Sequence, residues 1–513
     1  MDSVGRLRRG RCDQDRRHDR GAQRHPGVLA VNHAAAPLFE AIREFVEREQ
    51  APLYSPGHKG GRTLDPWFRE NIAALDLNNL PDTDTLHCPE GPILQAEQLV
   101  ADAWRVGQSF ILVQGSTSGN IAVALSALRP GEPVLVQRNA HKSVLAGLVQ
   151  VGALPVWLEP RWDTQFGIAH GLDADVVERA LAASGASALW MLHPTYYGTT
   201  ADISALSELC RRFDARLLVD GAHSPHFAFH PELPVPAEKS GAAATVQSVH
   251  KVLSGLSQAA VLHIDPHAID PATVRRALQL IQTTSPHFAI MASIDLARRQ
   301  MMIDGRDLLG RALERARHAA TRLAATPGLR VLRPEDASGA GTGFHQLDET
   351  KLLIGTTGLA ADAHDIVARL NRVHGVQPEL SGPGHVLCIS TIGNTDTDMD
   401  RLVAGFTEVA GWAGRADTFG GGDTLTTDLL ALRGPTVLTP REAFFAQTDT
   451  VALTDATGLV AAEAITPYPP GIPLVMPGER LTGEVIDLLR ALRDAGNPIS
   501  ASDPKLGAVK VVR

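Results

Sequence analysis

The chain has 513 residues, of which 44% are hydrophobic and 20% are charged, and its formal net charge is -9. At roughly 100–200 residues per domain, this length predicts two to four domains with a buried core, and the acidic balance excludes a general basic surface for nucleic acid. No apolar run approaches the ~18–20 residues of a membrane span, no signal-peptide core opens the chain, and the four scattered cysteines predict neither disulfides nor a zinc knuckle, as is typical of a cytoplasmic protein.

The organisation of the chain predicts several segments in succession. The first two dozen residues are rich in Arg with interspersed Asp, which favours a disordered tail over a transit peptide or a nucleic-acid-binding arm. Much later in the chain, residues 290–327 show a long helical pattern. The Gly-rich stretch GRADTFGGGDT, which begins at residue 414, is typical of a linker. We therefore expect a tail at 1–30, an arm at 31–75, a large domain at 76–300, a smaller α/β domain at 301–413, the linker at 414–424 and a C-terminal α+β domain at 425–513.

Short apolar runs alternate with amphipathic segments between residues 110 and 265. In the segments 119–128, 172–184 and 203–213, apolar residues recur three or four apart, which predicts helices. The repetition of strand, helix and strand predicts a mostly parallel sheet with helices on both faces, in which ligands bind beyond the carboxyl ends of the strands. The predicted strands are 110–114, 133–137, 154–158, 188–192, 215–220, 243–247 and 259–264.

The segment 115-GSTSGN-120 lies between the first of these strands and a predicted helix. Its small residues let backbone amides approach an anion, and the hydroxyls of Ser116, Thr117 and Ser118 can donate to that anion. The helix N-terminus adds the positive end of its dipole. These features predict a phosphate site, with a Gly/Ser turn that only caps the helix as the alternative.

Three further side chains follow strands. Asp220 ends the apolar run LLVD, where it can direct a carboxylate into a cleft or cap a turn. His141 can stack on a ring or cap the next helix. Lys251 is an amine in an otherwise apolar part of the chain, where a surface lysine at a strand end is the alternative.

In combination, these groups meet the needs of pyridoxal phosphate. The cofactor requires a lysine amine that forms a Schiff base with its aldehyde, a carboxylate that keeps its pyridine nitrogen protonated, and an anion site for its phosphate. Lys251, Asp220 and the segment 115–120 supply one of each. We therefore predict a pyridoxal-phosphate site at the carboxyl ends of the strands, with Lys251 as the attachment point.

The chain carries, in this order, the motifs 56-PGHKGG, 115-GSTSGN, 138-RNAHKSV, 194-PTYYGTTADI, 220-DGAHSPH, 248-SVHK and 467-PYPPGIPLVMPGE. Their wording and order resemble the Orn/Lys/Arg decarboxylase family in its shorter bacterial form, from about residue 37 to the C-terminus. The resemblance implies the aspartate-aminotransferase-like fold type I of pyridoxal-phosphate enzymes. It also implies a homodimer or larger homo-oligomer, because active sites of this fold type are built at a subunit interface.

The resemblance assigns roles to the residues named above. It implies that Lys251 forms the Schiff base and that Asp220 pairs with the pyridine nitrogen. His141 would stack on the ring, and His223 would lie beside the ring near Asp220. The phosphate would be surrounded by Ser116, Thr117, Ser248 and His250, together with the Ser118 hydroxyl.

The chain departs from the family pattern at two positions in the loop after Asp220. Gly221 stands where an acidic or small polar residue is usual, and Ser224 stands where glycine is usual. Neither position supplies an essential group. We therefore expect only the shape of this loop to differ.

The resemblance implies decarboxylation of arginine, lysine or ornithine to an amine and carbon dioxide, a reaction of polyamine biosynthesis. Aminotransferases bind the substrate carboxylate with an arginine, often on a late strand of the small domain, and the comparable strand 385-HVLCISTI-392 has none. Because an arginine clamp would stabilise the carboxylate that is about to leave, this favours decarboxylation. The shorter form favours arginine as the substrate. The alternatives are an aminotransferase or other carbanion enzyme of the same fold, and an inactive regulator that binds pyridoxal phosphate.

A substrate with a cationic side chain needs an acidic partner. The candidates are Glu379 and Glu463, and Tyr468 is a candidate for the entrance to the site. Three neighbouring histidines could suggest a metal site, but their segment contains a proline and no carboxylate at ligand spacing, so we expect no metal. These histidines are His223, His226 and His230.

Overall fold

The computed structural model describes residues 34–337, 341–416, 432–467, 472–494, 496 and 498–513. The predicted tail at 1–30 and most of the predicted linker lie outside the described residues. The chain divides into two compact units, residues 1–49 and 50–513. The first contains helix α1 (Pro37–Glu47), which begins with a proline, the residue whose missing amide proton costs nothing at a helix start.

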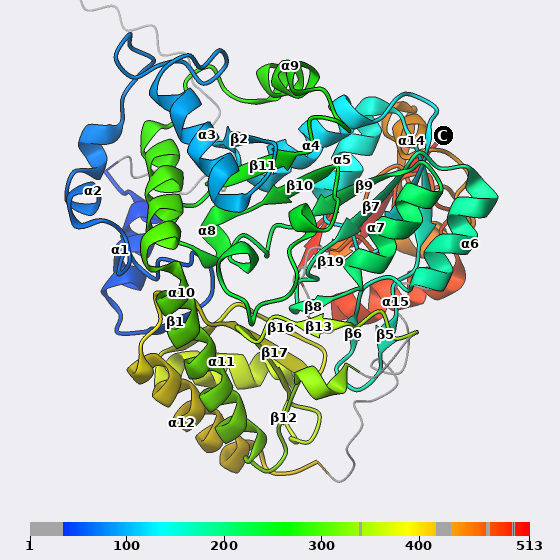
Figure 1. Ribbon diagram of the computed structural model, residues 1–513. Coiled ribbons are helices and arrows are strands. Elements are labelled where there is room, and N and C mark those ends of the chain that lie inside the picture. Colours follow the sequence, from blue (N-terminus) through cyan, green and yellow to red (C-terminus); the bar gives the residue numbers. More distant parts are fainter. Residues whose placement is uncertain (1–33, 338–340, 417–431, 468–471, 495, 497) are drawn as a thin grey trace, which may run out of the picture. The chain divides into compact units, whose positions relative to one another are not determined.

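A seven-stranded sheet forms the centre of the second unit, in the order β2-β11-β10-β9-β7-β3-β4 (Figure 1). Neighbouring strands are parallel from β10 to β4, whereas β11 is antiparallel to both β10 and β2. All seven predicted strands are present, so the prediction of a mostly parallel sheet is confirmed. The strands are β2 (Gln108–Leu112), β3 (Pro133–Gln137), β4 (Leu154–Leu158), β7 (Ala188–Leu192), β9 (Arg216–Asp220), β10 (Ala244–Gln247) and β11 (Ala260–Ile264).

The first strand and the first helix both begin earlier than predicted. The apolar run of β2 continues through Val113, but the amide of Val113 donates to the side-chain oxygen of Gln282 at 2.9 Å and not to a neighbouring strand. The strand therefore ends at Leu112. The helix then starts at Gly115, so that the predicted phosphate segment forms its first turn.

Helices cover both faces of the central sheet, because successive side chains of a strand point to opposite faces. Leu218 of β9 packs on the face covered by α4, α5 and α9, while Leu217 and Val219 pack on the face covered by α6 and α7. Burial on both faces explains why these strands are nearly continuous apolar runs. The covering helices are α4 (Gly115–Ala127), α5 (Lys142–Val151) and α9 (Pro271–Ile281) on one face, and α3 (Pro92–Trp104), α6 (Ala174–Ser184), α7 (Ile203–Arg212) and the first part of α10 (Phe288–Ala324) on the other.

Helix α10 leads into a second sheet, which is antiparallel and has the order β12-β14-β17-β16. Although α10 has 37 residues, no helix in the described part of the chain is both long and apolar enough to cross a membrane. The elements of this region are β12 (Arg330–Val331), β14 (Lys351–Gly355), α11 (Ala363–His374), β15 (Val376–Pro378), β16 (Leu380–Gly382), β17 (His385–Ile389) and α12 (Asp396–Ala413), and β15 pairs in parallel with β1 (Ala51–Leu53).

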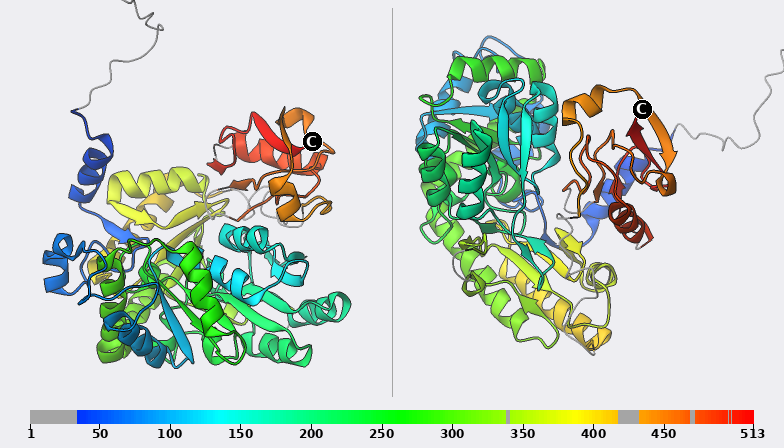
Figure 2. Two further views of the ribbon diagram at one scale, coloured as in Figure 1. Left: turned by 90° about the horizontal axis from the view of Figure 1, so that it is seen from above. Right: turned by 90° about the vertical axis from the view of Figure 1, so that its right-hand side faces the viewer.

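The C-terminal segment has its own apolar core and forms one group of elements, coloured orange to red in Figure 2. It is joined to the central sheet through Arg138, a buried residue in the loop after β3. The guanidinium of Arg138 donates to the carbonyls of Pro473 at 2.7 Å and Leu474 at 2.8 Å, and it lies 3.2 Å from the Glu479 carboxylate. The elements of the segment are α14 (Pro440–Phe445), β18 (Thr448–Ala452), β19 (Thr466–Pro467), α15 (Gly483–Asp494), β20 (Ile499–Ser500) and β21 (Ala508–Val512).

We expect the substitution Arg138→Met to lower the free energy of unfolding by about 3–5 kcal/mol, because it leaves the buried Glu479 carboxylate without its cation. Urea unfolding followed by tryptophan fluorescence measures the change. Arg513→Met is the matched control, because Arg513 pairs with Asp449 at the surface, where such a pair contributes about 0–1 kcal/mol. Equal losses in the two variants would contradict the structural role of Arg138.

Candidate active site

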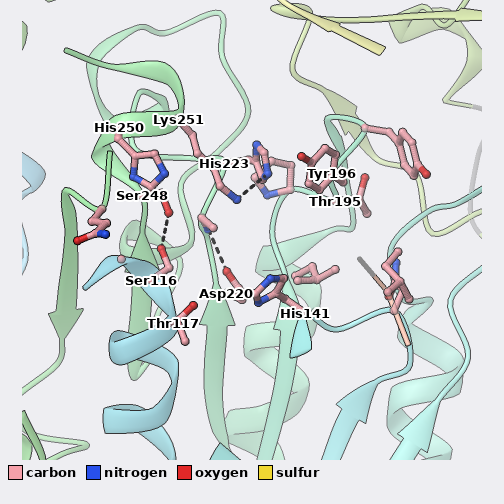
Figure 3. A pocket seen from close by; sticks show the side chains of 18 of the residues that line it. Ser116, Thr117, His141, Thr195, Tyr196, Asp220, His223, Ser248, His250 and Lys251 are labelled. Carbon is pink, nitrogen blue, oxygen red and sulfur yellow. Dashed lines mark hydrogen bonds between the residues drawn. The ribbon is translucent and has the colours of Figure 1, made fainter. Parts of the chain in front are cut away.

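A cavity of about 400 Å³ lies at the carboxyl ends of the parallel strands (Figure 3). Loops that follow β3, β7, β9 and β10 all contribute to its wall, which is the place where open α/β sheets bind ligands. The cavity brings together eight of the nine residues predicted to bind the cofactor. These eight are Ser116, Thr117, His141, Asp220, His223, Ser248, His250 and Lys251.

The N-terminus of helix α4 forms one part of the cavity wall. Gly115 has a φ of +70°, which favours glycine, and its amide donates to the carbonyl of Gln258 at 2.9 Å. Ser116 follows and exchanges a hydrogen bond with Ser248. Ser118, the ninth residue, is buried and does not line the cavity, because its hydroxyl donates to the Gly115 carbonyl at 2.9 Å. The helix end and the remaining hydroxyls suit an anion such as phosphate.

His250 is held by the backbone beside this anion site. Its Nδ1 lies 3.0 Å from the carbonyl oxygen of Ala259, so Nδ1 carries a proton and donates it. Burial lowers the pKa of His250 to about 4. The ring is therefore neutral at physiological pH, and an anion in the cavity would favour a second proton on Nε2.

The Asp220 carboxylate ends strand β9 and is almost completely buried. Oδ1 accepts a hydrogen bond from the amide of Ala222 at 3.1 Å, and Oδ2 accepts one from the side-chain nitrogen of Asn120 at 2.9 Å. The same Asn120 nitrogen donates to the Ser143 hydroxyl at 2.8 Å. Asn120, together with Ser143, therefore orients the predicted carboxylate, and neither residue was singled out from the sequence. Both lie inside quoted motifs, but an Asn and a Ser near a helix start carry no specific signal.

His141 caps a helix, as one of the two sequence interpretations predicted, and it also lines the cavity. Its Nδ1 accepts from the amide of Ser143 at 3.2 Å, as the N-cap of α5. Because Nδ1 is an acceptor there, the neutral ring carries its proton on Nε2. Burial lowers the pKa of His141, although Asp220 opposes that shift.

Lys251 extends into the cavity from the short helix α8 (Val249–Val252). Its Nζ lies 3.0 Å from Nε2 of His223, whose ring contacts the ring of Tyr196 with 4.6 Å between centroids. Burial lowers the pKa of Lys251, while the carboxylates of Asp220 and Glu379 oppose the shift. A lowered pKa increases the fraction of the neutral amine, which is the form of lysine that acts as a nucleophile.

The two departures from the family pattern compensate for each other. A Cβ atom at Gly221 would lie 2.7 Å from Oγ of Ser224 and 3.0 Å from Cγ2 of Thr245. The Ser224 hydroxyl occupies that space and donates to the carbonyl of Gly221 at 2.8 Å. The missing side chain at Gly221 thus leaves the space that the additional side chain at Ser224 fills.

The predicted substrate acids lie in different surroundings. Glu379 accepts hydrogen bonds from the Tyr196 hydroxyl at 2.7 Å and from the Ser55 amide at 2.8 Å, which places it beside the cavity wall. Glu463 accepts from the amides of Ser502 and Lys510 within the C-terminal segment, and it does not line the cavity. Tyr468, the third candidate, lies outside the described residues.

The three neighbouring histidines face different partners. His223 contacts Lys251, Nε2 of His226 lies 3.1 Å from an oxygen of Asp348, and Nδ1 of His230 accepts from the amide of Glu232. Among the residues that the structure describes, no three His, Cys, Asp or Glu side chains are arranged to hold a metal ion.

The N-terminal motif 56-PGHKGG lies against the segment that carries Lys251. The amide of Gly57 donates to the carbonyl of His250 at 2.7 Å, and the hydroxyl of Ser55 donates to the carbonyl of Lys251 at 3.3 Å. A Cβ atom at Gly57 would lie 2.5 Å from the carbonyl oxygen of Leu253. The close approach of Gly57 to the backbone at Leu253 explains why this position of the motif is a glycine. Sequence analysis did not foresee this contact.

The donor set fits pyridoxal phosphate in three respects. An amine with a lowered pKa and an oriented carboxylate enter the same cavity, and a helix end with hydroxyl groups lines the same wall. The cavity is also large enough for a small cofactor, since such sites span about 300–1,000 Å³. Lys251, Asp220 and Ser116 are thus placed where the aldehyde, pyridine nitrogen and phosphate each find a suitable partner.

Comparisons with known proteins give a family and a fold. The model described as Orn/Lys/Arg decarboxylase, major domain, matches residues 36–398, and the model of the C-terminal domain matches residues 427–500. Arginine decarboxylase of Bacillus subtilis (strain 168) is 34% identical over 484 residues, which are 93% of this chain and 98% of that protein.

Two solved structures share the fold. The constitutive lysine decarboxylase of E. coli has a TM-score of 0.72 and 25% identity, over 93% of this chain and 82% of that chain. Ureidoglycine-glyoxylate aminotransferase of Bacillus subtilis has a TM-score of 0.54 at 15% identity, over 74% of this chain and 97% of that one, and so shows the fold alone. Fold type I and the dependence on pyridoxal phosphate are thereby confirmed.

We expect Gly221→Ala to lower the free energy of unfolding by about 1–3 kcal/mol, because the new Cβ atom would overlap the Ser224 hydroxyl. The double substitution Gly221→Ala and Ser224→Gly should recover part of that loss, since it removes the obstructing hydroxyl. Urea unfolding of these two variants and of Ser224→Gly alone measures the coupling between the two positions. Gly411→Ala, which adds a Cβ atom where no other atom lies within 4 Å, is the control. Strictly additive effects at 221 and 224 would refute the compensation.

Proposed function

Because the chain belongs to the Orn/Lys/Arg decarboxylase family, we propose that it decarboxylates arginine to carbon dioxide and the corresponding amine. Enzymes of this family act on basic amino acids with pyridoxal phosphate. The observation that carries the proposal is the meeting of Lys251, Asp220 and the N-terminus of α4 in one cavity.

The extent of the matches supports arginine as the substrate. The relative named arginine decarboxylase is matched over 98% of its length at 34% identity, whereas the solved lysine decarboxylase is matched over 82% of its chain at 25% identity. The chain therefore has the size of the arginine enzyme. Single-methylene differences contribute only about 1–3 kcal/mol to discrimination, so an assay must decide.

Pyridoxal phosphate, when bound, supplies an electron sink for the electron pair left on Cα as the bond to the carboxylate breaks. Lys251 would attach the cofactor through its amine. Asp220 would hold the pyridine nitrogen in its protonated form, and His141 would lie against the ring. Ser116 and Thr117 would hold the phosphate, together with the N-terminus of α4.

After carbon dioxide leaves, Cα must receive a proton. Once displaced, Lys251 would carry the protons that the substrate ammonium gives up, and the ammonium formed in this way would deliver one of them to Cα. His223 Nε2, 3.0 Å from the amine, lies next in line to replenish it. Delivery by a positioned amine keeps the proton at one face of the reacting carbon.

The cavity wall supports loss of the carboxylate over amino-group transfer. No arginine is among the described residues that line it, and Arg138 in the nearby loop is already held by Glu479 and by carbonyls of the C-terminal segment. A carboxylate without such a clamp is less stabilised before it leaves. The fold does not decide the matter, since an aminotransferase shares it.

The enzyme is further proposed to work in the cytoplasm as a homodimer or larger assembly. The described cysteines Cys88, Cys210 and Cys388 are free thiols, as expected in a reducing compartment. Sites of fold type I are built where two subunits meet. A single-chain mass by light scattering would contradict the assembly.

The direct test is carbon dioxide release from arginine, lysine and ornithine separately, with pyridoxal phosphate supplied. We expect release from arginine at a kcat/KM at least tenfold above that for the other two, and loss of release in the Lys251→Ala variant. Release from lysine or ornithine alone would overturn the substrate assignment. If none of the three amino acids released carbon dioxide, the proposal that the chain is a decarboxylase would be overturned.

The same assay separates the two acid candidates. We propose that Glu379, which is bound to Tyr196 at the cavity wall, attracts the cationic end of the substrate. Glu379→Gln should then raise the KM for arginine about tenfold, while the matched change Glu463→Gln should leave it unchanged. A lowered kcat with an unchanged KM in Glu379→Gln would exclude it from substrate binding.

A further inference from the structure

We propose that Lys351 is a positioning residue: its ammonium fixes His223 as the tautomer that carries a proton on Nε2, and His223 then holds Lys251 as a neutral amine. The inference rests on the proposed role of Lys251 in cofactor attachment. It goes beyond that role, because it makes the protonation state of the Lys251 amine depend on Lys351, a residue of the second sheet.

His223 lies between two lysine amines. Its Nε2 is 3.0 Å from Nζ of Lys251, and its Nδ1 is 3.0 Å from Nζ of Lys351. The imidazole is 5% exposed and Lys351 is 1% exposed, so the contact between His223 and Lys351 is shielded from water. Lys351 does not line the cavity and reaches His223 from behind, as the first residue of β14.

An imidazole between two amines restricts their protonation. A neutral ring has one N–H donor and one acceptor nitrogen, so one amine must donate to it and the other must accept from it. Two ammonium groups would leave the ring N–H pointing at a cation without an acceptor. A protonated ring would require both amines to be neutral. The structure therefore requires a free amine beside the ring N–H, and the amine on the other side of His223 can be an ammonium.

The carboxylate of Asp348 decides which amine is charged. Asp348 is fully buried and accepts from the amide of Thr350 at 3.0 Å and from its hydroxyl at 2.6 Å, while Nε2 of His226 lies 3.1 Å away. A buried carboxylate requires a cation nearby, and Asp348 is the strongest influence that opposes the loss of the proton from Lys351. Burial lowers the pKa of Lys351 to about 8, so it remains largely charged at neutral pH.

The neighbouring turn is shaped to admit the Lys351 side chain. Gly198 has a φ of +92°, and a Cβ atom there would lie 2.8 Å from Cγ of Lys351. The ring of Tyr196, in the same turn, contacts the ring of His223. The motif PTYYGTT thus provides both the passage for Lys351 and a surface for the imidazole.

The remaining charges around the two amines complete the assignment. Lys251 faces Asp220 and Glu379, which favour its ammonium, and the histidines at 141, 223 and 250, which do not. Asp220 already accepts two hydrogen bonds, and so does Glu379. Lys351 faces Asp348 and Glu379, which favour its ammonium, while burial lowers the pKa of the neighbouring Lys59 to about 7. Lys351 is therefore the donor to His223, and Lys251 is the acceptor.

Chemical labelling of the apoprotein tests this inference without cofactor or substrate. Acetic anhydride reacts with neutral amines, so the rate at Lys251 as a function of pH, followed by peptide mass spectrometry, gives the pKa of that amine. In Lys351→Met, Nδ1 of His223 can take the proton and Nε2 can accept from a Lys251 ammonium. We expect the pKa of Lys251 to rise by about one unit and its labelling at pH 7 to fall about tenfold.

Two further variants make the result specific. Lys351→Met combined with Asp348→Asn removes the buried cation and the carboxylate that favours its charge together. This double variant should raise the pKa of Lys251 equally while remaining folded by circular dichroism. Lys59→Met removes a buried lysine that donates to backbone carbonyls and not to His223, and it should leave the labelling unchanged. An unchanged or lowered pKa in the double variant, or an equal rise in Lys59→Met, would overturn the inference. If labelling behaves as expected but no amino acid is decarboxylated, only the proposed function fails.

Discussion

The site depends on the parallel pairing of strands β9 and β10. In that register Asp220, the last residue of β9, lies opposite Val246 of β10, and the chain continues from there to Lys251. A shift by one residue would turn the Asp220 side chain to the other face of the sheet. Both faces are packed with helices, so such a shift would direct the carboxylate into the apolar core on the other face. The cost of burying Asp220 there holds the register and thus the distance between the carboxylate and the amine.

A second set of contacts reaches this edge from distant parts of the chain. Ser55 follows strand β1, Glu379 lies between β15 and β16, and Lys351 begins β14. Each of these residues makes a hydrogen bond to a residue of the cavity wall or to the backbone beside it. The protonation state of Lys251 therefore depends on both sheets.

Much of this arrangement could be predicted from the sequence, and the rest could not for physical reasons. Short, nearly continuous apolar runs defined the strands, and polar residues that follow their carboxyl ends, such as Asp220 and Lys251, had to share one edge. Lys351 gave no signal, because a lysine at the start of a strand is ordinarily exposed and only tertiary packing buries it. The coupling between Gly221 and Ser224 was also invisible, since each looked like an independent departure until a Cβ atom was placed at Gly221.

Three lysines with lowered pKa values lie in or behind the cavity, namely Lys59, Lys251 and Lys351. Among the described residues only Lys251 lines the cavity wall, so it alone can meet the aldehyde of the cofactor. Reduction of the protein with borohydride after incubation with pyridoxal phosphate, followed by peptide mapping, is the most direct test. The account predicts that the pyridoxyl group is recovered on Lys251. Its recovery on Lys59 or Lys351 would contradict the account.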